Sequence, residues 1–101
     1  MNNEYPDAQI AAAREAVLAW LEARQPECYD SNAQLADGFV RFIASETASE
    51  LRSQWNPSAC VFEARWYDTG REISEFRESF SAESEPNARV LACAAMLLNA
   101  K

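Results

Sequence analysis

The first quarter of the chain carries mostly apolar side chains at helical spacing. Between residues 10 and 24 they recur every three or four positions, which places them on one face of an α-helix. The positions on this face, which ends at a basic residue, are Ile10, Ala13, Val17, Trp20, Leu21 and Arg24. Asp7 is suited to cap the helix, and Pro26 disfavours helical backbone at the residue before it. The pattern predicts a helix from Asp7 to about Ala23.

A second helix is predicted after a short loop. Its start carries the capping-box sequence S-x-x-Q, from Ser31 to Gln34. An apolar stripe follows at helical spacing and consists of Leu35, Phe39, Phe42 and Ile43. Because a glycine inside a helix costs about 1 kcal/mol relative to alanine, we expect Gly38 to permit close packing.

The stretch after Ala44 is polar and gives a weaker pattern. Ser45 or Thr47 is suited to cap a third helix that holds Leu51 and Trp55. One long helix that continues the second is the alternative. The sequence NPS that follows is typical of a turn.

Residues 59–67 alternate in polarity, which predicts a strand with one buried face. One face would carry Cys60, Phe62, Ala64 and Trp66. The other would carry Val61, Glu63, Arg65 and Tyr67, and it offers a surface for a homodimer or another partner if no helix covers it. The sequence DTG then predicts a hairpin.

The segment from Arg71 to Ser81 fits two structures. As a strand, it places Phe76 and Phe80 on one face. As a helix, it places Ile73 on one face with both phenylalanines. The preceding DTG turn favours the hairpin strand over the helix.

The last helix is predicted to start at SEP, because proline suits a first helical turn. Its buried stripe is formed by Val90, Leu91, Ala94, Leu97 and Leu98. The run LACAAMLL is apolar almost all round, so we expect this helix to be the most buried. Together these elements predict a single α+β domain over residues 1–101, in the order α-α-β-β-α. Helices would pack on a two-stranded antiparallel hairpin, and an all-α domain is the alternative.

The aromatic residues fall into two expected groups. Those predicted to lie in the core are Trp20, Phe39, Phe42, Phe62 and Trp66. Trp55 and Tyr67 lie near the ends of predicted elements and are the candidates for an exposed contact patch. Cys60 and Cys93 stand in apolar sequence and are expected in the core, whereas Cys28 stands in a polar loop.

Composition removes several classes of function. The formal net charge is −7, which disfavours direct binding of nucleic acid. No apolar run approaches the roughly 20 residues of a membrane span. The polar opening MNNEYPD predicts no secretory signal and a cytoplasmic protein. The chain has no histidine, only two glycines and three widely spaced cysteines, so we expect no catalytic residues, no metal and no cofactor.

A band of acidic residues near the end of the chain is the candidate partner-binding site. It consists of Asp68, Glu72, Glu75, Glu78, Glu83 and Glu85. Carboxylates spaced along a rigid element imitate nucleic acid phosphates to a basic groove and speed association by long-range attraction. An edge strand charged against aggregation is the simpler interpretation.

The closing segment FSAESEPNARVLACAAMLLNA resembles the end of many small phage- and prophage-encoded accessory proteins, and AQIAAAREAVLAWLEA has a similar character. The resemblance implies a small α–β–α sandwich encoded by a mobile element and located in the host cytoplasm. It also implies a function: small acidic phage proteins of this kind are often inhibitors of host nucleic-acid-targeting machinery, including anti-CRISPR proteins.

These observations together predict a non-catalytic acidic binding protein. Its expected partner is a host protein with a basic surface, such as a CRISPR–Cas complex or another defence enzyme. A small self-associating module, a homodimer with no inhibitory role, is the alternative.

Overall fold

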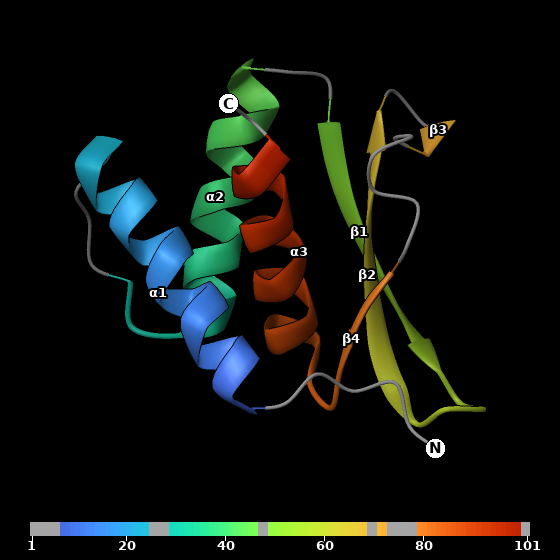
Figure 1. The fold of residues 1–101 in the computed structure, drawn as a ribbon. Coiled ribbons are helices and arrows are strands. Elements are labelled where there is room, and N and C mark those ends of the chain that lie inside the picture. Colours follow the sequence, from blue (N-terminus) through green and yellow to red (C-terminus); the bar gives the residue numbers. More distant parts are fainter. Residues whose placement is uncertain (1–6, 25–28, 47–48, 69–70, 73–78, 100–101) are drawn as a thin grey trace.

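The computed structural model describes residues 7–24, 29–46, 49–68, 71–72 and 79–99. Its elements in chain order are α1 (Asp7–Arg24), α2 (Asn32–Glu46), β1 (Ser49–Asn56), β2 (Val61–Asp68), β3 (Arg71–Glu72), β4 (Phe80–Ala82) and α3 (Glu85–Asn99). The helices pack on one side of an antiparallel sheet (Figure 1). The α+β class is therefore confirmed, and the observed order of described elements is α-α-β-β-β-β-α rather than α-α-β-β-α.

Strand β2 is the centre of the sheet. Strand β1 pairs with it along its whole length, from Ser49 opposite Asp68 to Asn56 opposite Val61. Strands β3 and β4 both pair with β2, β3 near its end and β4 near its start. The described sheet is therefore three strands wide, because β3 and β4 share the side of β2 opposite β1. The predicted hairpin of two strands lacked β1.

The prediction of a helix around Leu51 and Trp55 was wrong, because these residues lie in β1. Residues four apart share a face in a helix and also in a strand, so their spacing fits both structures. Pairing with β2 decides between them: Leu51 lies opposite Trp66, and Trp55 lies opposite Phe62. The Trp55 and Phe62 rings are 4.9 Å apart.

The predicted alternation of β2 is confirmed, although the strand begins at Val61 rather than residue 59. Strand β3 continues it as a hairpin, with Asp68 opposite Arg71. The structure shows strand at 71–72 and again at 80–82. Residues 73–78 lie outside the described residues, so the choice between strand and helix is decided only at the two ends of this segment.

The turn between β1 and β2 corrects the prediction for Cys60. The Asn56 side-chain oxygen accepts hydrogen bonds from the backbone N–H groups of Ser58 and Ala59, at 3.0 and 3.3 Å. Cys60 closes the turn in the left-handed region, with φ of 57°. It is exposed rather than buried in the core, since the turn lifts it out of the strand.

Helix α3 lies between the sheet and the other two helices, as its apolar sequence predicts (Figure 1). Its contact with the sheet includes a buried hydrogen bond, in which Trp66 Nε1 donates to the Ala92 carbonyl oxygen at 2.8 Å. Cys93 is buried beside this contact, as expected. Phe39 of α2 reaches the same place, with its ring 6.3 Å from that of Trp66. The core is therefore centred on α3 and the helix side of β2.

Of the five aromatic residues predicted in the core, Phe39 and Trp66 are fully buried. Trp20, Phe42 and Phe62 are half-buried. The two indole and phenyl contacts of Trp20, with Phe39 at 4.9 Å and Phe42 at 5.0 Å, join α1 to α2.

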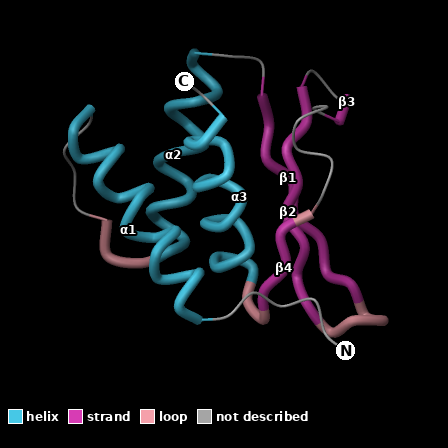
Figure 2. The backbone as a smooth tube through the Cα atoms, in the orientation of Figure 1, coloured by secondary structure: helices cyan, strands magenta, loops and turns pink. Residues whose placement is uncertain are grey.

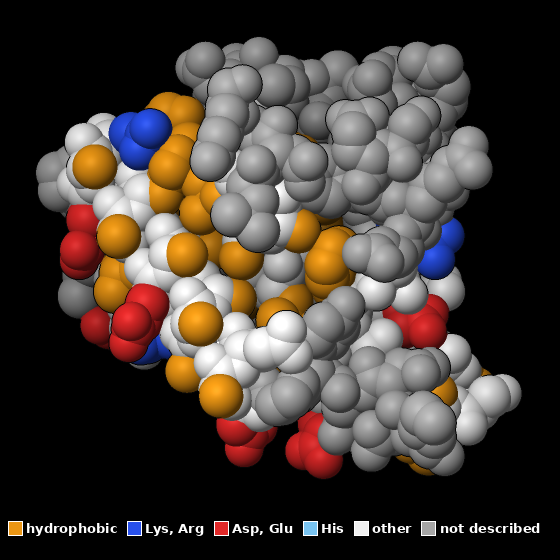
Figure 3. All heavy atoms as spheres, viewed as in Figure 1, with side chains coloured by type: hydrophobic (Ala, Val, Ile, Leu, Met, Phe, Trp, Pro, Cys, Tyr) orange, Lys and Arg blue, Asp and Glu red, His pale blue; other side chains and the backbone are white. Residues whose placement is uncertain are grey.

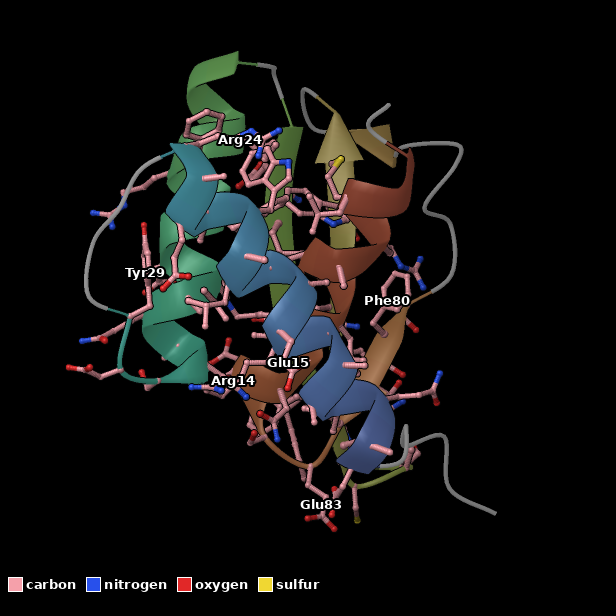
Figure 4. The ribbon with its side chains drawn as sticks, turned by 60° about the vertical axis from the view of Figure 1, so that its left-hand side comes forward. Arg14, Glu15, Arg24, Tyr29, Phe80 and Glu83 are labelled. Atoms are coloured by element: carbon pink, nitrogen blue, oxygen red, sulfur yellow. The ribbon has the colours of Figure 1, made fainter. Side chains whose placement is uncertain are left out.

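Gly38 allows the close approach that its position in α2 predicts. A Cβ atom at this position would lie 2.7 Å from Cε1 of Tyr29, well inside van der Waals contact. Tyr29 lies along α2, next to the helix surface (Figure 4). The space that a side chain at position 38 would take is therefore occupied by the Tyr29 ring of the preceding loop.

Candidate functional site

The described helices cover only one face of the sheet (Figure 2). We call the opposite face, turned away from the helices, the open face. Alternation along the paired strands assigns side chains to it. These are Glu50, Arg52 and Gln54 of β1, Val61, Glu63, Arg65 and Tyr67 of β2, and Ser81 of β4.

The open face is uneven in its exposure. Val61 and Ser81 are buried, at 0% and 3% exposed. Toward the middle of the face, Arg52 and Gln54 are exposed, and Glu63, Arg65 and Tyr67 are half-buried. Here the surface forms a polar hollow of about 270 Å³. Its lining includes Arg52, Gln54, Glu63, Arg65, Tyr67 and Ser79.

Two arginines face each other across the hollow. Arg52 lies directly opposite Arg65 in the register of β1 and β2. Side chains in such positions have Cβ atoms about 5 Å apart, and like charges placed there destabilise a sheet. The register therefore brings two of the chain's eight arginines side by side on the open face.

Neighbouring groups offset part of that repulsion. Arg52 Nη2 donates to Glu50 Oε1 at 3.2 Å, in an ion pair whose side chains are more than half exposed. The guanidinium carbon of Arg52 also lies 4.7 Å from the centre of the Tyr67 ring, in a cation–π contact. The Arg52 side chain is thereby held between Glu50 and the Tyr67 ring at the edge of the hollow.

The rim of the hollow nearest the β1–β2 turn is also ordered by hydrogen bonding. Glu63 Oε2 accepts a hydrogen bond from Asn56 Nδ2 at 3.0 Å. The hollow thus presents guanidinium donors, a phenol and an exposed amide on a rigid sheet. Such groups bind carboxylates and carbonyl oxygens of a partner.

The predicted acidic band is divided by the strand pairing. Glu72 lies opposite Tyr67, and Glu83 directly follows Ala82, which lies opposite Phe62. The five residue steps from Phe62 to Tyr67 separate these positions by about 16 Å along β2. Asp68 lies at the same end as Glu72, while Glu75 and Glu78 lie outside the described residues. The described members of the band therefore stand at the two ends of the sheet.

Glu83 and Glu85 are exposed beside the start of α3. Glu83 lies at the end of the molecule where the helices begin (Figure 4). Glu85 accepts a hydrogen bond from the Ser53 hydroxyl. It also stands in the first turn of α3, where the helix dipole stabilises a negative charge. Glu85 therefore has a structural role that ties α3 to β1.

A second hollow, of about 340 Å³, lies between α1, α3 and β4 and is apolar. Its lining includes Ala12, Ala16, Phe80, Leu91 and Leu97. Apolar side chains gather over this part of the surface (Figure 3), and Phe80 lies beside α3 (Figure 4). Gln9 contributes a polar side chain to the lining, and no charged side chain of the described residues belongs to it.

Cys93 is the one titratable group in the described part of the chain with a large shift. Burial in the core raises the pKa of its thiol well above the ordinary range, and the nearby Arg89 only partly opposes this. A thiol held in the neutral form is a poor nucleophile. Cys93 therefore acts as an apolar core residue.

Two absences hold for the residues that the structure describes. No helix among them has both the length and the apolar composition needed to cross a membrane. Within the same ranges, no three acidic or cysteine side chains are grouped so that they could hold a metal ion.

Comparison of the chain with known protein families, curated proteins and solved structures found no significant match. The resemblance to phage-encoded accessory proteins therefore stays a prediction from the sequence.

The amino-acid sequence predicts the β2 half of the open face but not the β1 half. The alternation of β2 predicts that Glu63, Arg65 and Tyr67 share a face. Arg52 and Gln54 were missed because residues 49–56 were assigned to a helix. Leu51 and Trp55 are the only apolar residues of ELRSQWN, and a spacing of four residues fits a helix and a strand equally well, so no local signal identifies this strand.

Proposed function

We propose that this chain is a non-catalytic binding protein that engages another protein through the open face of its sheet. The observation that carries the proposal is the Arg52–Arg65 pair, set directly opposite each other on a face that no described helix covers. Two neighbouring guanidinium groups offer several donors to the carboxylates or carbonyl oxygens of a partner.

The composition of the hollow supports a protein partner. Arginine and tyrosine are enriched among the residues that contribute most to protein–protein binding. Tyr67 presents a large ring with few rotatable bonds, and Arg52 lies stacked on it. These two side chains lose little conformational freedom on binding. A net charge of −7 makes nucleic acid a poor ligand for the same face.

Inhibition of a host nucleic-acid-targeting or defence enzyme is a second candidate function. It rests on the net charge and on the acidic band of residues 68–85, which would occupy a basic surface of that enzyme and of which Glu83 and Glu85 are exposed. The two candidates differ in the surface they use and in the sign of the partner's charge.

Affinity capture with matched variants separates them. The tagged chain is incubated with bacterial lysate at low and high salt, and retained proteins are identified by mass spectrometry. Binding through the open face predicts that Tyr67→Ala and Arg52→Ala lose a partner that Arg41→Ala, altered at an exposed arginine of α2, still retains. Retention by both open-face variants would contradict the proposal.

The acidic alternative is tested in the same experiment by a triple charge reversal. Replacing Glu72, Glu75 and Glu78 by lysine would abolish capture of a basic enzyme, and capture by the unaltered chain would fall steeply with salt. Loss of the partner in this variant alone, with full retention by Tyr67→Ala, would favour the inhibitor over the open-face binder.

A further inference from the structure

Strand β1 is a long edge strand. Its eight residues pair with β2 along one side, and none of the described strands pairs with its other side. The opposite edge of the sheet is formed by β3 and β4, which have two and three residues. Short edge strands protect a sheet from association, whereas a long one presents a row of N–H and C=O groups that can pair with another strand.

The same strand carries an exposed tryptophan. Trp55 is 49% exposed, and no other large apolar side chain among the described residues is exposed. It stands on the helix side of the sheet, against Phe62, and part of its ring faces solvent. Tryptophan in this setting contributes strongly to binding when a partner covers it.

The sequence of β1 complements itself when a second copy runs antiparallel about Ser53. In this register Trp55 lies opposite Leu51 of the second copy, which joins two apolar side chains. Arg52 lies opposite Gln54, and Glu50 lies opposite Asn56, so each charge meets an amide. Two-fold symmetry repeats each of these pairs.

Neighbouring registers are poorer. Pairing centred on Arg52 places this arginine opposite itself, and like charges in that position are unfavourable. Pairing centred on Leu51 joins only the first residues of β1 and leaves Trp55 beyond its paired part. In the register centred on Ser53, pairing runs over 50–56, about 23 Å, and ends beside Pro57, which has no N–H to donate.

We propose that two copies of this chain associate edge to edge through β1, around a two-fold axis at Ser53, and form one continuous antiparallel sheet. This contact runs along the edge of β1 rather than over the open face, and it leaves the hollows of both copies on the same side of the joined sheet. Because both copies carry the same negative charge, added salt strengthens the dimer by screening their repulsion.

A disulfide placed at the axis tests the contact. Ser53→Cys is made together with Cys28→Ser and Cys60→Ser, which leaves Cys93 in the core as the only other thiol. Opposed residues of antiparallel strands have Cα atoms about 5 Å apart, within the range of a disulfide. Under mild oxidation, we expect roughly tenfold more linked dimer than from Gln54→Cys in the same background, whose position faces Arg52 of the second copy.

Charge variants at Gln54 test the register without a new thiol. Gln54 faces Glu63 within the chain and Arg52 of the second copy across the axis. Gln54→Glu therefore tightens the dimer while it weakens the hairpin, and Gln54→Arg does the opposite. Since each dimer holds two such pairs, the dimer dissociation constant changes by about 2- to 30-fold, measured by sedimentation equilibrium.

The outcomes separate this proposal from the open-face function. Tyr67→Ala removes a side chain of the hollow and is expected to leave the dimer unchanged. A chain that stays monomeric at several hundred micromolar overturns the dimer. A dimer that ignores both Gln54 variants and links equally well through residues 53 and 54 overturns the β1 register. A dimer lost in Tyr67→Ala assigns self-association to the open face instead.

Discussion

The two faces of strand β2 differ in what their side chains contact, although neighbouring residues supply both. Trp66 on the helix side is fully buried and donates a hydrogen bond to the Ala92 carbonyl oxygen. Tyr67 on the open face is half-buried and lies under an exposed guanidinium. The comparison indicates that the helix side holds the fold together, while the middle of the open face carries polar and charged groups that are still accessible to a partner.

The largest expected effect is the difference in free energy of unfolding between variants at Trp66 and at its neighbour Tyr67. Trp66→Ala removes a fully buried indole and is expected to lower the free energy of unfolding by about 3–5 kcal/mol. Tyr67→Ala removes a half-buried ring and is expected to cost about 1 kcal/mol or less. Urea denaturation of both variants, with Trp66→Phe as a milder control, measures the difference. Equal losses of unfolding free energy in the two variants would contradict the difference drawn between the two faces of β2.

The pH dependence of the free energy of unfolding is expected to show that the Cys93 thiol of α3 is buried in the core. The unfolded chain ionises Cys93 near its ordinary pKa of about 8.5, whereas burial keeps the folded thiol neutral to higher pH. Above that pH the unfolded state loses a proton that the folded state keeps. The contribution of Cys93 to stability is therefore full below about pH 8.5 and falls by up to about 1.4 kcal/mol per pH unit above it.

Denaturant unfolding between pH 8 and 10 measures this slope, and Cys93→Ala is the control that removes it. The difference in free energy of unfolding between the two chains is expected to stay constant up to about pH 8 and to change above pH 9, because the thiol that titrates there is present in only one of them. A constant difference would mean that the thiol is solvated in the folded protein.

Substitution at Gly38 tests how closely the helical layer is packed. Gly38→Ala gains about 1 kcal/mol of helix propensity but drives a Cβ into the Tyr29 ring, and we expect a net loss of about 1 kcal/mol. In a Tyr29→Ala background, the same substitution is expected to stabilise the chain by about 1 kcal/mol. A double-mutant cycle by thermal denaturation gives the coupling. Additive effects would show that the ring does not restrict this position.

The smallest expected effect lies at the turn that joins the two long strands. Cys60 adopts a left-handed conformation that glycine accepts without steric cost. Cys60→Gly is expected to raise the free energy of unfolding by about 0.5–1 kcal/mol, and Cys60→Val to lower it. Chemical denaturation of the pair checks the sign. A loss of stability in the glycine variant would contradict the role given to this conformation.

Periodicity predicts the helices and β2 because each presents several residues to one neighbour. The stripe of the second helix includes Phe39 and Ile43, and both are buried as expected. Strand β1 has only Leu51 and Trp55 as apolar residues, and their spacing fits a helix and a strand equally well. Its structure depends on pairing with β2, which no local pattern specifies.

The candidate site divides in the same way. Arg65 and Tyr67 follow from the alternation of one strand. Their juxtaposition with Arg52 depends on the register between two strands, and a β1–β2 turn of different length would have shifted it. The acidic band is continuous in sequence, yet Glu72 and Glu83 lie at opposite ends of β2 because separate strands hold them there.

The most direct test of the account is partner binding by Tyr67→Ala, measured at a temperature where its folded fraction matches that of the unaltered chain. Once capture has identified a partner, titration calorimetry gives the two affinities. The account predicts at least roughly a tenfold loss of affinity with little loss of stability, as for a central interface residue. An unchanged affinity would contradict the assignment of the open face as the binding surface.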